Sequence, residues 1–166
     1  MDCGAKVNLA AANAAGATAF ADIAEHSPWV AEAAFKHAPF ANREEMTVHF
    51  ADAVMQATRP MQIALLNAHP DLATKAKLTK DSTNEQRSAG LEVLTHDELA
   101  HFTNLNTLYK SRNGFPFIFA VKGATKYQIL EGFEQRLKNS AEVEFVTALQ
   151  QVCKIIRFRL EERVSA

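Results

Sequence analysis

Signals that start and stop helices recur along almost the whole chain, and they restrict the fold more than any other feature. Ser, Thr or Asn stands repeatedly just before an apolar pattern of helical spacing, where its side chain can accept a hydrogen bond from a first-turn N–H. The predicted N-caps are Ser27, Asn42, Ser82, Thr95, Thr125 and Asn139 or Ser140. Arg59-Pro60 and His69-Pro70 are predicted helix boundaries, because proline cannot continue a helix, and Asn113-Gly114 is a typical C-terminal stop.

Between these signals, apolar residues fall three or four positions apart, which places them on one face of a helix. The clearest stripes are Met46, Phe50 and Val54; Leu99, Phe102, Leu105 and Tyr109; and Phe145, Leu149, Val152, Ile156 and Leu160. The last stripe predicts a long helix from Ala141 to about Arg163. We therefore expect an all-α fold, a compact bundle of about eight helices. We expect residues 1–166 to form one domain, with residues 1–17 as a loosely ordered N-terminal segment.

One stretch, "GFPFIFAVKG" from Gly114 to Gly123, does not fit this helical pattern. It is nearly all apolar, and Pro116 disfavours both a helix and a central strand because it lacks an N–H. We expect an extended segment through the helical core. Its backbone N–H and C=O groups need partners there, and a polar ligand is one way to supply them.

Charge and motifs exclude several classes of function. The net charge is −1, so no basic field for nucleic acid is present, and no stretch approaches the length of a membrane span. The usual metal, nucleotide and serine-hydrolase motifs are absent, and His96 and His101 are five residues apart, which is not the spacing of a helical metal site. Cys3 and Cys153 are typical of free thiols in a reducing compartment. Without a signal-peptide pattern, we expect a cytoplasmic protein.

His69 is the first candidate for chemistry. It stands at a predicted helix end directly before Pro70. The simpler interpretation is a cationic side chain at the negative end of the helix dipole, and spacing alone favours it. The alternative is an acid/base group placed where the chain turns away from the helix.

Glu85 is the second candidate, and it also has two interpretations. Ser82 and Glu85 have the spacing of a capping box, which would need no further role. A first-turn glutamate beside the helix N-terminal amides also suits a binding site for an anion or a polar heterocycle. That site would include Ser82, Thr83, Asn84 and the amide of Gln86. The sequence does not separate these alternatives.

Arg159 is the third candidate, in the last turns of the long C-terminal helix. A solvated arginine paired with Glu162 would contribute little. However, Arg159 adjoins Phe158 and Leu160 at the edge of the apolar stripe, so its guanidinium can reach inward. A buried guanidinium generally needs a carboxylate partner, and a substrate can be that partner.

Together these stretches resemble one family. The segments "EHSPWVAE", "AHPDLATKAKLTKDSTNEQRSAGL", "LNTLYKSRNGFPFIFAVKG", "ILEGFEQRL" and "IIRFRLEE" are similar to 2-oxo-4-hydroxy-4-carboxy-5-ureidoimidazoline (OHCU) decarboxylases of urate degradation. The resemblance runs from about Phe20 to Glu161, and the ordered combination of HPDL, SxxEQxxAGL and GFPFI is specific. One departure is Asn113, where family members often have an aromatic residue.

The resemblance implies an all-α enzyme, a carboxy-lyase without cofactor or metal, that forms (S)-allantoin from OHCU. It places catalytic roles on His69, Glu85 and Arg159. Substrate contacts fall on Pro70, Ser82, Thr83, Asn84, Gln86, Phe117, Ile118, Phe119, Ala120 and Val121. It also favours a homodimer, the commonest symmetric assembly.

The substrate chemistry agrees with the absence of a cofactor motif, because a C=N bond beside the reacting carbon can accept the electron pair that carbon dioxide leaves behind. We expect His69, Glu85 and Arg159 to converge on one small cavity around the extended segment. The main alternative is a non-catalytic all-helical protein-interaction module whose apolar stripes bind partners. A third interpretation is another cofactor-free acid/base enzyme, such as a lyase or isomerase, acting on a cyclic ureide.

Overall fold

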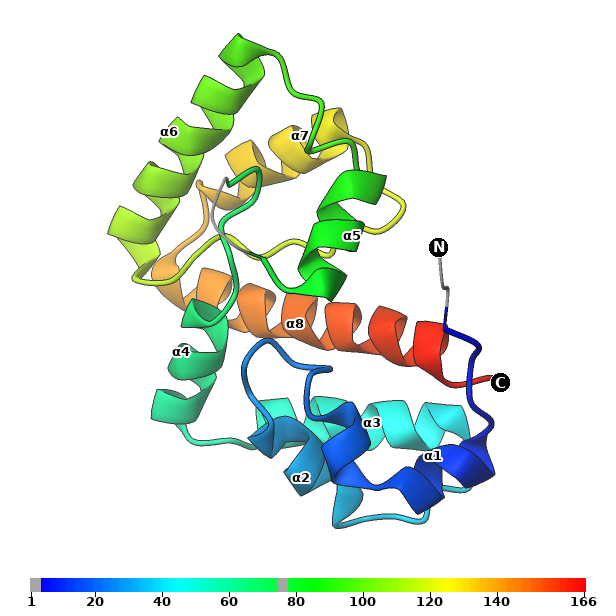
Figure 1. Cartoon of the computed structure of the whole chain (residues 1–166). Helices are drawn as coiled ribbons and strands as arrows, with labels where there is room; N and C mark the ends of the chain where they lie inside the picture. The colour runs from blue at the N-terminus through cyan, green and yellow to red at the C-terminus, as the bar shows by residue number, and fades with distance from the viewer. Residues whose placement is uncertain (1–3, 75–77) are drawn as a thin grey trace. The chain divides into compact units, whose positions relative to one another are not determined.

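The computed structural model describes residues 4–74 and 78–166, and in these ranges its regular elements are all helices (Figure 1). The elements are α1 Leu9–Ala15, the 3-10 helix η1 Ala17–Phe20, α2 Trp29–Phe35, α3 Arg43–Met55, α4 Arg59–Asn67, α5 Lys80–Ser88, α6 His96–Asn113, α7 Lys126–Arg136 and α8 Ala141–Arg163. The prediction of an all-α fold with about eight helices is confirmed. No helix within the described ranges is long and apolar enough to cross a membrane.

The described residues form two compact units. Unit 1 comprises the chain up to Ala68 together with Cys153–Ala166, and unit 2 comprises His69–Val152. Helix α8 contributes its first part to unit 2 and its last part to unit 1. One domain over residues 1–166 stays a prediction.

Unit 1 is built around the packing of α2 on α3 (Figure 1). The Phe35 ring of α2 contacts the rings of Phe20, Phe40 and Phe50. The stripe Met46, Phe50 and Val54 is fully buried, as predicted. Residues 1–17 were expected to be loosely ordered, but Leu9–Ala15 within them form the regular helix α1. The Asn13 side chain of this helix makes two hydrogen bonds with the backbone of Phe40. The two ends of the unit are tied by backbone hydrogen bonds of Val7 with Arg163 and Ser165.

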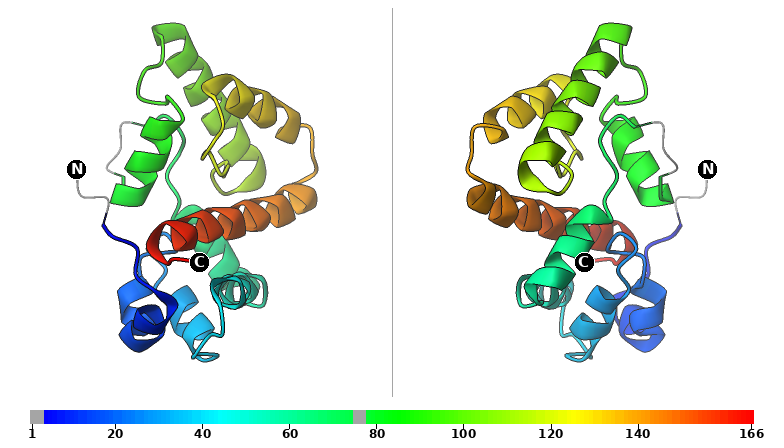
Figure 2. Two further views of the ribbon diagram at one scale, coloured as in Figure 1. Left: turned by 90° about the vertical axis from the view of Figure 1, so that its right-hand side faces the viewer. Right: turned by 90° about the vertical axis from the view of Figure 1, so that its left-hand side faces the viewer.

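Unit 2 contains α5, α6, α7 and the first part of α8, and α7 lies alongside α6 in both views of Figure 2. The segment predicted to be extended follows Gly114 and has neither helix nor strand. Phe115, Phe117, Ile118, Ala120 and Val121 are all buried, so it runs through the core of this unit as predicted. The Phe117 and Phe133 rings stack with their centroids 3.8 Å apart, which fixes the segment against α7.

Most predicted helix ends are confirmed. Thr95 and Thr125 both form complete capping boxes, with Glu98 and Gln128 respectively, and Gly114 takes the left-handed conformation (φ 79°) that ends α6. One start is wrong by a residue: Pro28 is the N-cap of α2, and the Ser27 hydroxyl instead donates to the Glu25 carbonyl. The helix start predicted at Ser82 is also wrong.

Candidate functional site

His69 lies two residues beyond the end of α4, in a stretch without regular structure that continues through Pro70, Asp71 and Leu72. Its side chain is only 9% exposed. A surface histidine at a helix end would remain largely solvated, so this degree of burial weakens the interpretation of His69 as a simple dipole partner.

Helix α5 begins at Lys80, three residues before the predicted start. Thr79 is the N-cap, and its hydroxyl accepts from Ser82 N at 3.2 Å. Glu85 therefore lies in the second turn, where it cannot complete a capping box, and that interpretation of Glu85 is wrong. The N-cap thus lies three positions before the predicted one, and Ser82 is a buried residue of the first turn.

The amides that were expected to form an anion site at residues 82–84 have partners within the helix. Thr83 N donates to the Thr79 carbonyl at 2.9 Å, as does the Thr83 hydroxyl, and the Asn84 side chain is exposed. The idea of an open helix N-terminus at residues 82–84 is therefore wrong, because these residues are inside the helix. Substrate contacts by Ser82, Thr83 and Asn84 stay a prediction.

The buried face of α5 is polar, which is unusual for a helix this short. Ser82 is 5% exposed and Gln86 is 6% exposed, with Glu85 half-buried beside them. Helical spacing puts all three on adjacent positions of one face. Burying amide and hydroxyl groups is costly unless they are hydrogen-bonded, and Gln86 Oε1 accepts from Ala73 N at 3.0 Å. This face therefore holds the irregular stretch after His69 as well as packing in the core.

The segment from Phe117 to Val121 is held through its backbone by side chains from two helices. The Arg136 guanidinium donates to the Ile118 carbonyl, and Ala120 N donates to Gln151 Oε1 at 2.9 Å. Within the described residues, the N–H groups of Ile118 and Val121 and the carbonyl of Ala120 have no hydrogen-bond partner. Such groups in a buried segment suit a polar ligand.

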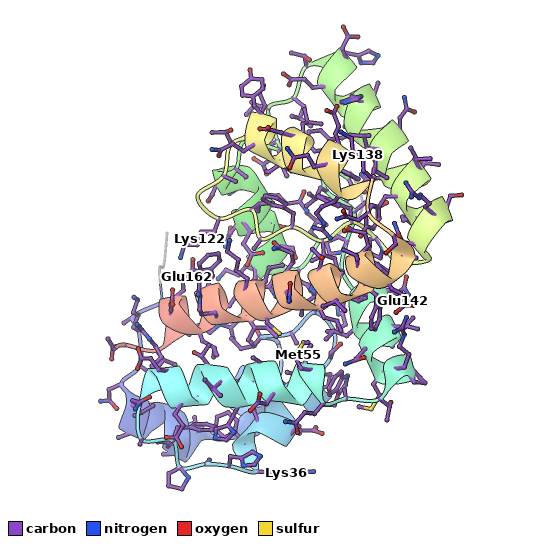
Figure 3. The ribbon with its side chains drawn as sticks, turned by 180° about the vertical axis from the view of Figure 1, so that it is seen from behind. Lys36, Met55, Lys122, Lys138, Glu142 and Glu162 are labelled. Atoms are coloured by element: carbon purple, nitrogen blue, oxygen red, sulfur yellow. The ribbon has the colours of Figure 1, made fainter. Side chains whose placement is uncertain are left out.

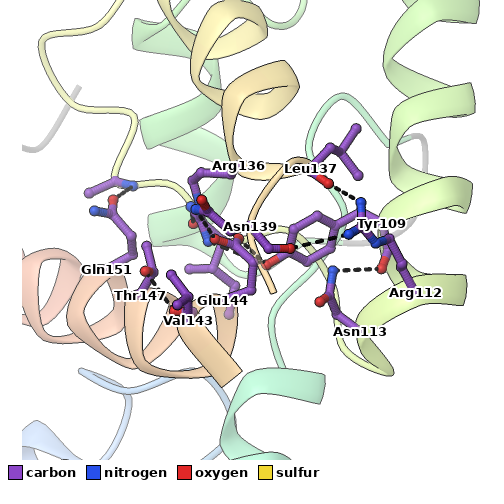
Figure 4. Close-up of polar contacts among 12 residues, drawn as sticks. Tyr109, Arg112, Asn113, Arg136, Leu137, Asn139, Val143, Glu144, Thr147 and Gln151 are labelled. Carbon is purple, nitrogen blue, oxygen red and sulfur yellow. Dashed lines mark hydrogen bonds and ion pairs between the residues drawn. The ribbon is translucent and has the colours of Figure 1, made fainter. Parts of the chain in front are cut away.

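Arg136 is itself fixed by a buried charge cluster, drawn in Figure 4. Glu144, which is fully buried, accepts from Arg136 Nε at 2.9 Å, from the Tyr109 hydroxyl at 2.6 Å and from Asn139 Nδ2 at 3.0 Å. Burial and the hydrogen bond to Glu144 raise the pKa of Tyr109 well above its usual value. This cluster satisfies the charges internally and gives the extended segment a rigid support.

Arg159 belongs to unit 1 and is 3% exposed, so its interpretation as a solvated arginine is wrong. It donates to Glu25 Oε1 at 2.8 Å and to the Ile23 carbonyl at 3.0 Å. The expected carboxylate partner is thus present in the protein itself. Glu25 lies 134 residues from Arg159, and no local sequence pattern marks it as the partner. Convergence of His69, Glu85 and Arg159 on one cavity stays a prediction.

The remaining histidines lie outside this set. His37 and His49 stack with ring centroids 4.2 Å apart, and His101 contacts Glu134 at 3.0 Å. No group of three His, Cys, Asp or Glu side chains suited to a metal ion occurs among the described residues. Cys153 is a free thiol, whereas Cys3 lies outside the described residues.

Comparisons with known proteins place this geometry in context. The family model for OHCU decarboxylase matches residues 10–161. A Haloferax volcanii protein named 2-oxo-4-hydroxy-4-carboxy-5-ureidoimidazoline decarboxylase is 43% identical over 148 residues, covering 89% of this chain and 88% of its own. A Bacillus uric acid degradation bifunctional protein is 39% identical over 140 residues, covering 84% of this chain but 28% of its own. A solved structure described as (S)-allantoin synthase is 31% identical with a TM-score of 0.76, covering 95% of this chain and 54% of that one.

Proposed function

The chain belongs to the OHCU decarboxylase family, and we propose that His69, Glu85 and Arg159 carry out its reaction, the decarboxylation of OHCU to (S)-allantoin in urate degradation. The enzyme is a carboxy-lyase. The observation that carries the assignment of residues is the buried polar set His69, Ser82 and Gln86 in unit 2, the unit that also contains the core segment with unpaired backbone groups. The alternative of a non-catalytic interaction module is not favoured, because the relatives are named as enzymes.

The substrate contains its own electron sink. When the bond from the ring carbon to the carboxylate breaks, its electron pair forms a double bond to the neighbouring ring carbon, and the C=N electrons move onto nitrogen, which takes a proton. The neighbouring carbon then takes a second proton while the hydroxyl loses its own and becomes a carbonyl. One proton is consumed for each carbon dioxide released, and the protein needs only to orient the ring and move protons.

Arg159 is proposed to bind an anionic or carbonyl edge of the substrate. Its guanidinium is held by Glu25 and the Ile23 carbonyl, so its direction is set before substrate binds. Planar donors in a fixed orientation suit carboxylate and carbonyl oxygens. Such preorganisation lowers the cost of placing charge next to the reacting group.

His69 is proposed as the general acid/base that exchanges a proton with the ring hydroxyl or the developing enol. Proton delivery to one face of the ring carbon produces one enantiomer. The apolar walls proposed for this step are Pro70 and Phe117, and Phe117 is 1% exposed and stacked on Phe133. Contributions of this kind are typically about 10²–10⁴ in rate.

Glu85 is proposed to orient ureido or ring N–H groups and to join the proton transfer. Two observations support this role: Thr79 does the capping, and Glu85 shares a helix face with buried Ser82 and Gln86. The ring amide is proposed to bind the unpaired backbone groups of residues 117–121, which include both donors and acceptors.

The test of function is optical. Urate is oxidised and hydrolysed by added upstream enzymes, and circular dichroism follows allantoin formation with and without this protein. The unassisted reaction is expected to give racemic product, so optical activity that depends on the protein supports the proposal. A racemate formed at the same rate in both samples would contradict it.

The test of His69 is its replacement by alanine. We expect His69→Ala to lose most activity, about 10²-fold or more, while the helical circular dichroism is retained. His101→Ala is the matched control, because it removes an exposed histidine that is hydrogen-bonded to Glu134. A His69→Ala protein that converts fresh substrate at the native rate removes His69 from the mechanism.

The test of Glu85 separates catalysis from capping. Glu85→Gln should lose activity and keep its melting temperature, whereas Thr79→Ala should lose about 0.5–2 kcal/mol of stability by removing the cap. Melting curves and initial rates of both variants decide the matter. An active Glu85→Gln protein that melts much lower would restore the structural interpretation.

A homodimeric state and a cytoplasmic location complete the proposal. The dimer rests on the frequency of two-fold assemblies and on family likeness. Light scattering after gel filtration measures the mass directly, and a monomer at micromolar concentration would refute the dimer. The location rests on the cysteine content, which is typical of a reducing compartment, and fractionation of cells tests it.

A further inference from the structure

The stretch from His69 to Ala73 has no regular structure of its own, yet three side chains from α5 and α6 hold it. Gln86 Oε1 accepts from Ala73 N at 3.0 Å, Asn106 Nδ2 donates to the Leu72 carbonyl at 2.9 Å, and Lys110 Nζ pairs with Asp71 at 3.2 Å. The contacts fall on three successive residues. The two to backbone groups, from Gln86 and Asn106, determine the path of the chain immediately after His69, whereas the Lys110 pair is exposed.

The path is conformationally demanding. Ala73 has φ +58°, in the left-handed region that a residue with a Cβ enters at a cost of roughly 1–2 kcal/mol. The hydrogen bond from Ala73 N to Gln86 stabilises this conformation. Backbone strain of this kind persists only where surrounding contacts hold it.

Of these three contacts, the one made by Asn106 is buried. It lies on the inward face of α6 beside Leu105 and Tyr109 and is 6% exposed. Its amide nitrogen bonds Leu72, 34 residues away, and its Oδ1 is buried without a hydrogen-bond partner among the described residues. A buried amide in which only the nitrogen is hydrogen-bonded destabilises the fold relative to an apolar side chain of similar size. We therefore attribute the role of Asn106 to its hydrogen bond with the Leu72 carbonyl.

We propose that Asn106 is a positioning residue, which orients His69 by holding the Leu72 carbonyl. The inference rests on the proposed function, because it requires His69 to be the acid/base group. Asn106 itself does not exchange the proton. It fixes the stretch from which the imidazole projects, and a displacement of about 1 Å at a reacting group can cost about 10²-fold in rate.

The test compares three variants of α6. Asn106→Leu removes the donor and keeps the branching of the side chain, and Asn106→Asp keeps the shape but places an oxygen against the Leu72 carbonyl. Lys110→Met is the matched control, one turn along the same helix and bonded to the same stretch, but through a side chain that is 51% exposed. We expect kcat to fall at least about tenfold in Asn106→Leu with KM within about twofold, and Lys110→Met to stay within about twofold in both.

Two readouts distinguish positioning from a merely structural role. A protonated aspartic acid can donate to Leu72, so the activity of Asn106→Asp relative to the native enzyme should rise as pH falls. In a His69→Ala background, Asn106→Leu should cause less than about a twofold further loss, because the group it positions is gone.

The outcomes are separable. Native kcat in Asn106→Leu, a raised KM with unchanged kcat, or a full additional loss in the His69→Ala background overturns the inference. Native turnover by His69→Ala overturns the assignment of His69 instead. If Asn106→Leu does not fold, the pH dependence of Asn106→Asp decides.

Discussion

Unit 2 holds two irregular stretches that we assign to the site, and it holds them by different means. The stretch 69–73 is bound mainly by neutral amides, Gln86 and Asn106. The stretch 115–121 is bound by the neutral amide of Gln151 and also by Arg136, whose charge is balanced by buried Glu144. A neutral hydrogen bond contributes about 1 kcal/mol, whereas breaking a buried ion pair costs about 3–5 kcal/mol. We therefore expect the second stretch to be held more firmly than the first.

The largest effect is expected when Glu144 is neutralised. Glu144→Gln leaves the mostly buried Arg136 without a counter-charge, so we expect a loss of about 3–5 kcal/mol in the free energy of unfolding. Urea unfolding followed by circular dichroism measures it. Glu142→Gln is the matched control, two residues away in the same first turn of α8 but at the surface (Figure 3), and it should cost less than about 1 kcal/mol. Equal losses of stability in Glu144→Gln and Glu142→Gln would show that the buried ion pair does not distinguish the support of stretch 115–121 from that of stretch 69–73.

A smaller effect is expected from Tyr109→Phe, which removes the 2.6 Å hydrogen bond to Glu144 and should cost about 1.5–3 kcal/mol near pH 7. The raised pKa of Tyr109 adds a dependence on pH. Above about pH 10, Tyr109 loses its proton in the unfolded chain but keeps it in the folded chain. The native protein therefore loses stability as pH rises, whereas Tyr109→Phe does not have this loss.

The gap in stability between native protein and Tyr109→Phe should therefore narrow from about pH 9 to about pH 11. Urea unfolding at several pH values measures the gap. Absorbance of tyrosinate, compared between the native protein and Tyr109→Phe, gives an independent check, because Tyr109 should keep its proton while the protein stays folded. Ionisation of Tyr109 near pH 10 without unfolding would show that the cluster is open to solvent.

The smallest effect on stability is expected from Gly132→Ala on α7. A Cβ there would lie 2.9 Å from the Phe119 ring, so the ring must move, while the helix gains up to about 1 kcal/mol from alanine. We expect the stability to change by less than about 1 kcal/mol and KM to rise roughly threefold, because Phe119 belongs to the proposed binding stretch. Glu131→Ala, an exposed neighbour, should change neither. An unchanged KM would remove Phe119 from the substrate contacts.

Helix ends and stripes were predictable where the signal is local. Thr95 with Glu98, and Thr125 before its helix, need only neighbours within four residues, and the stripe from Phe145 to Leu160 is buried as its spacing predicts. The start of α5 was not predictable in this way, because Thr79 and Ser82 are both common caps and Ser is the more favoured type. In the structure Thr79 is the cap and Ser82 is buried.

By itself, the sequence determined the helical class, most helix ends, the buried irregular segment and the likeness to a decarboxylase family. These follow from periodicity, backbone preferences and ordered motifs, all of which act over short distances along the chain. Only the tertiary structure paired Arg159 with Glu25, Asn106 with Leu72 and Arg136 with Ile118. The two buried pairs among these, Arg159 with Glu25 and Asn106 with Leu72, join residues 134 and 34 positions apart. Hydrogen bonds between such distant groups are decided by which buried polar atoms meet when the helices pack, and no local pattern records that outcome.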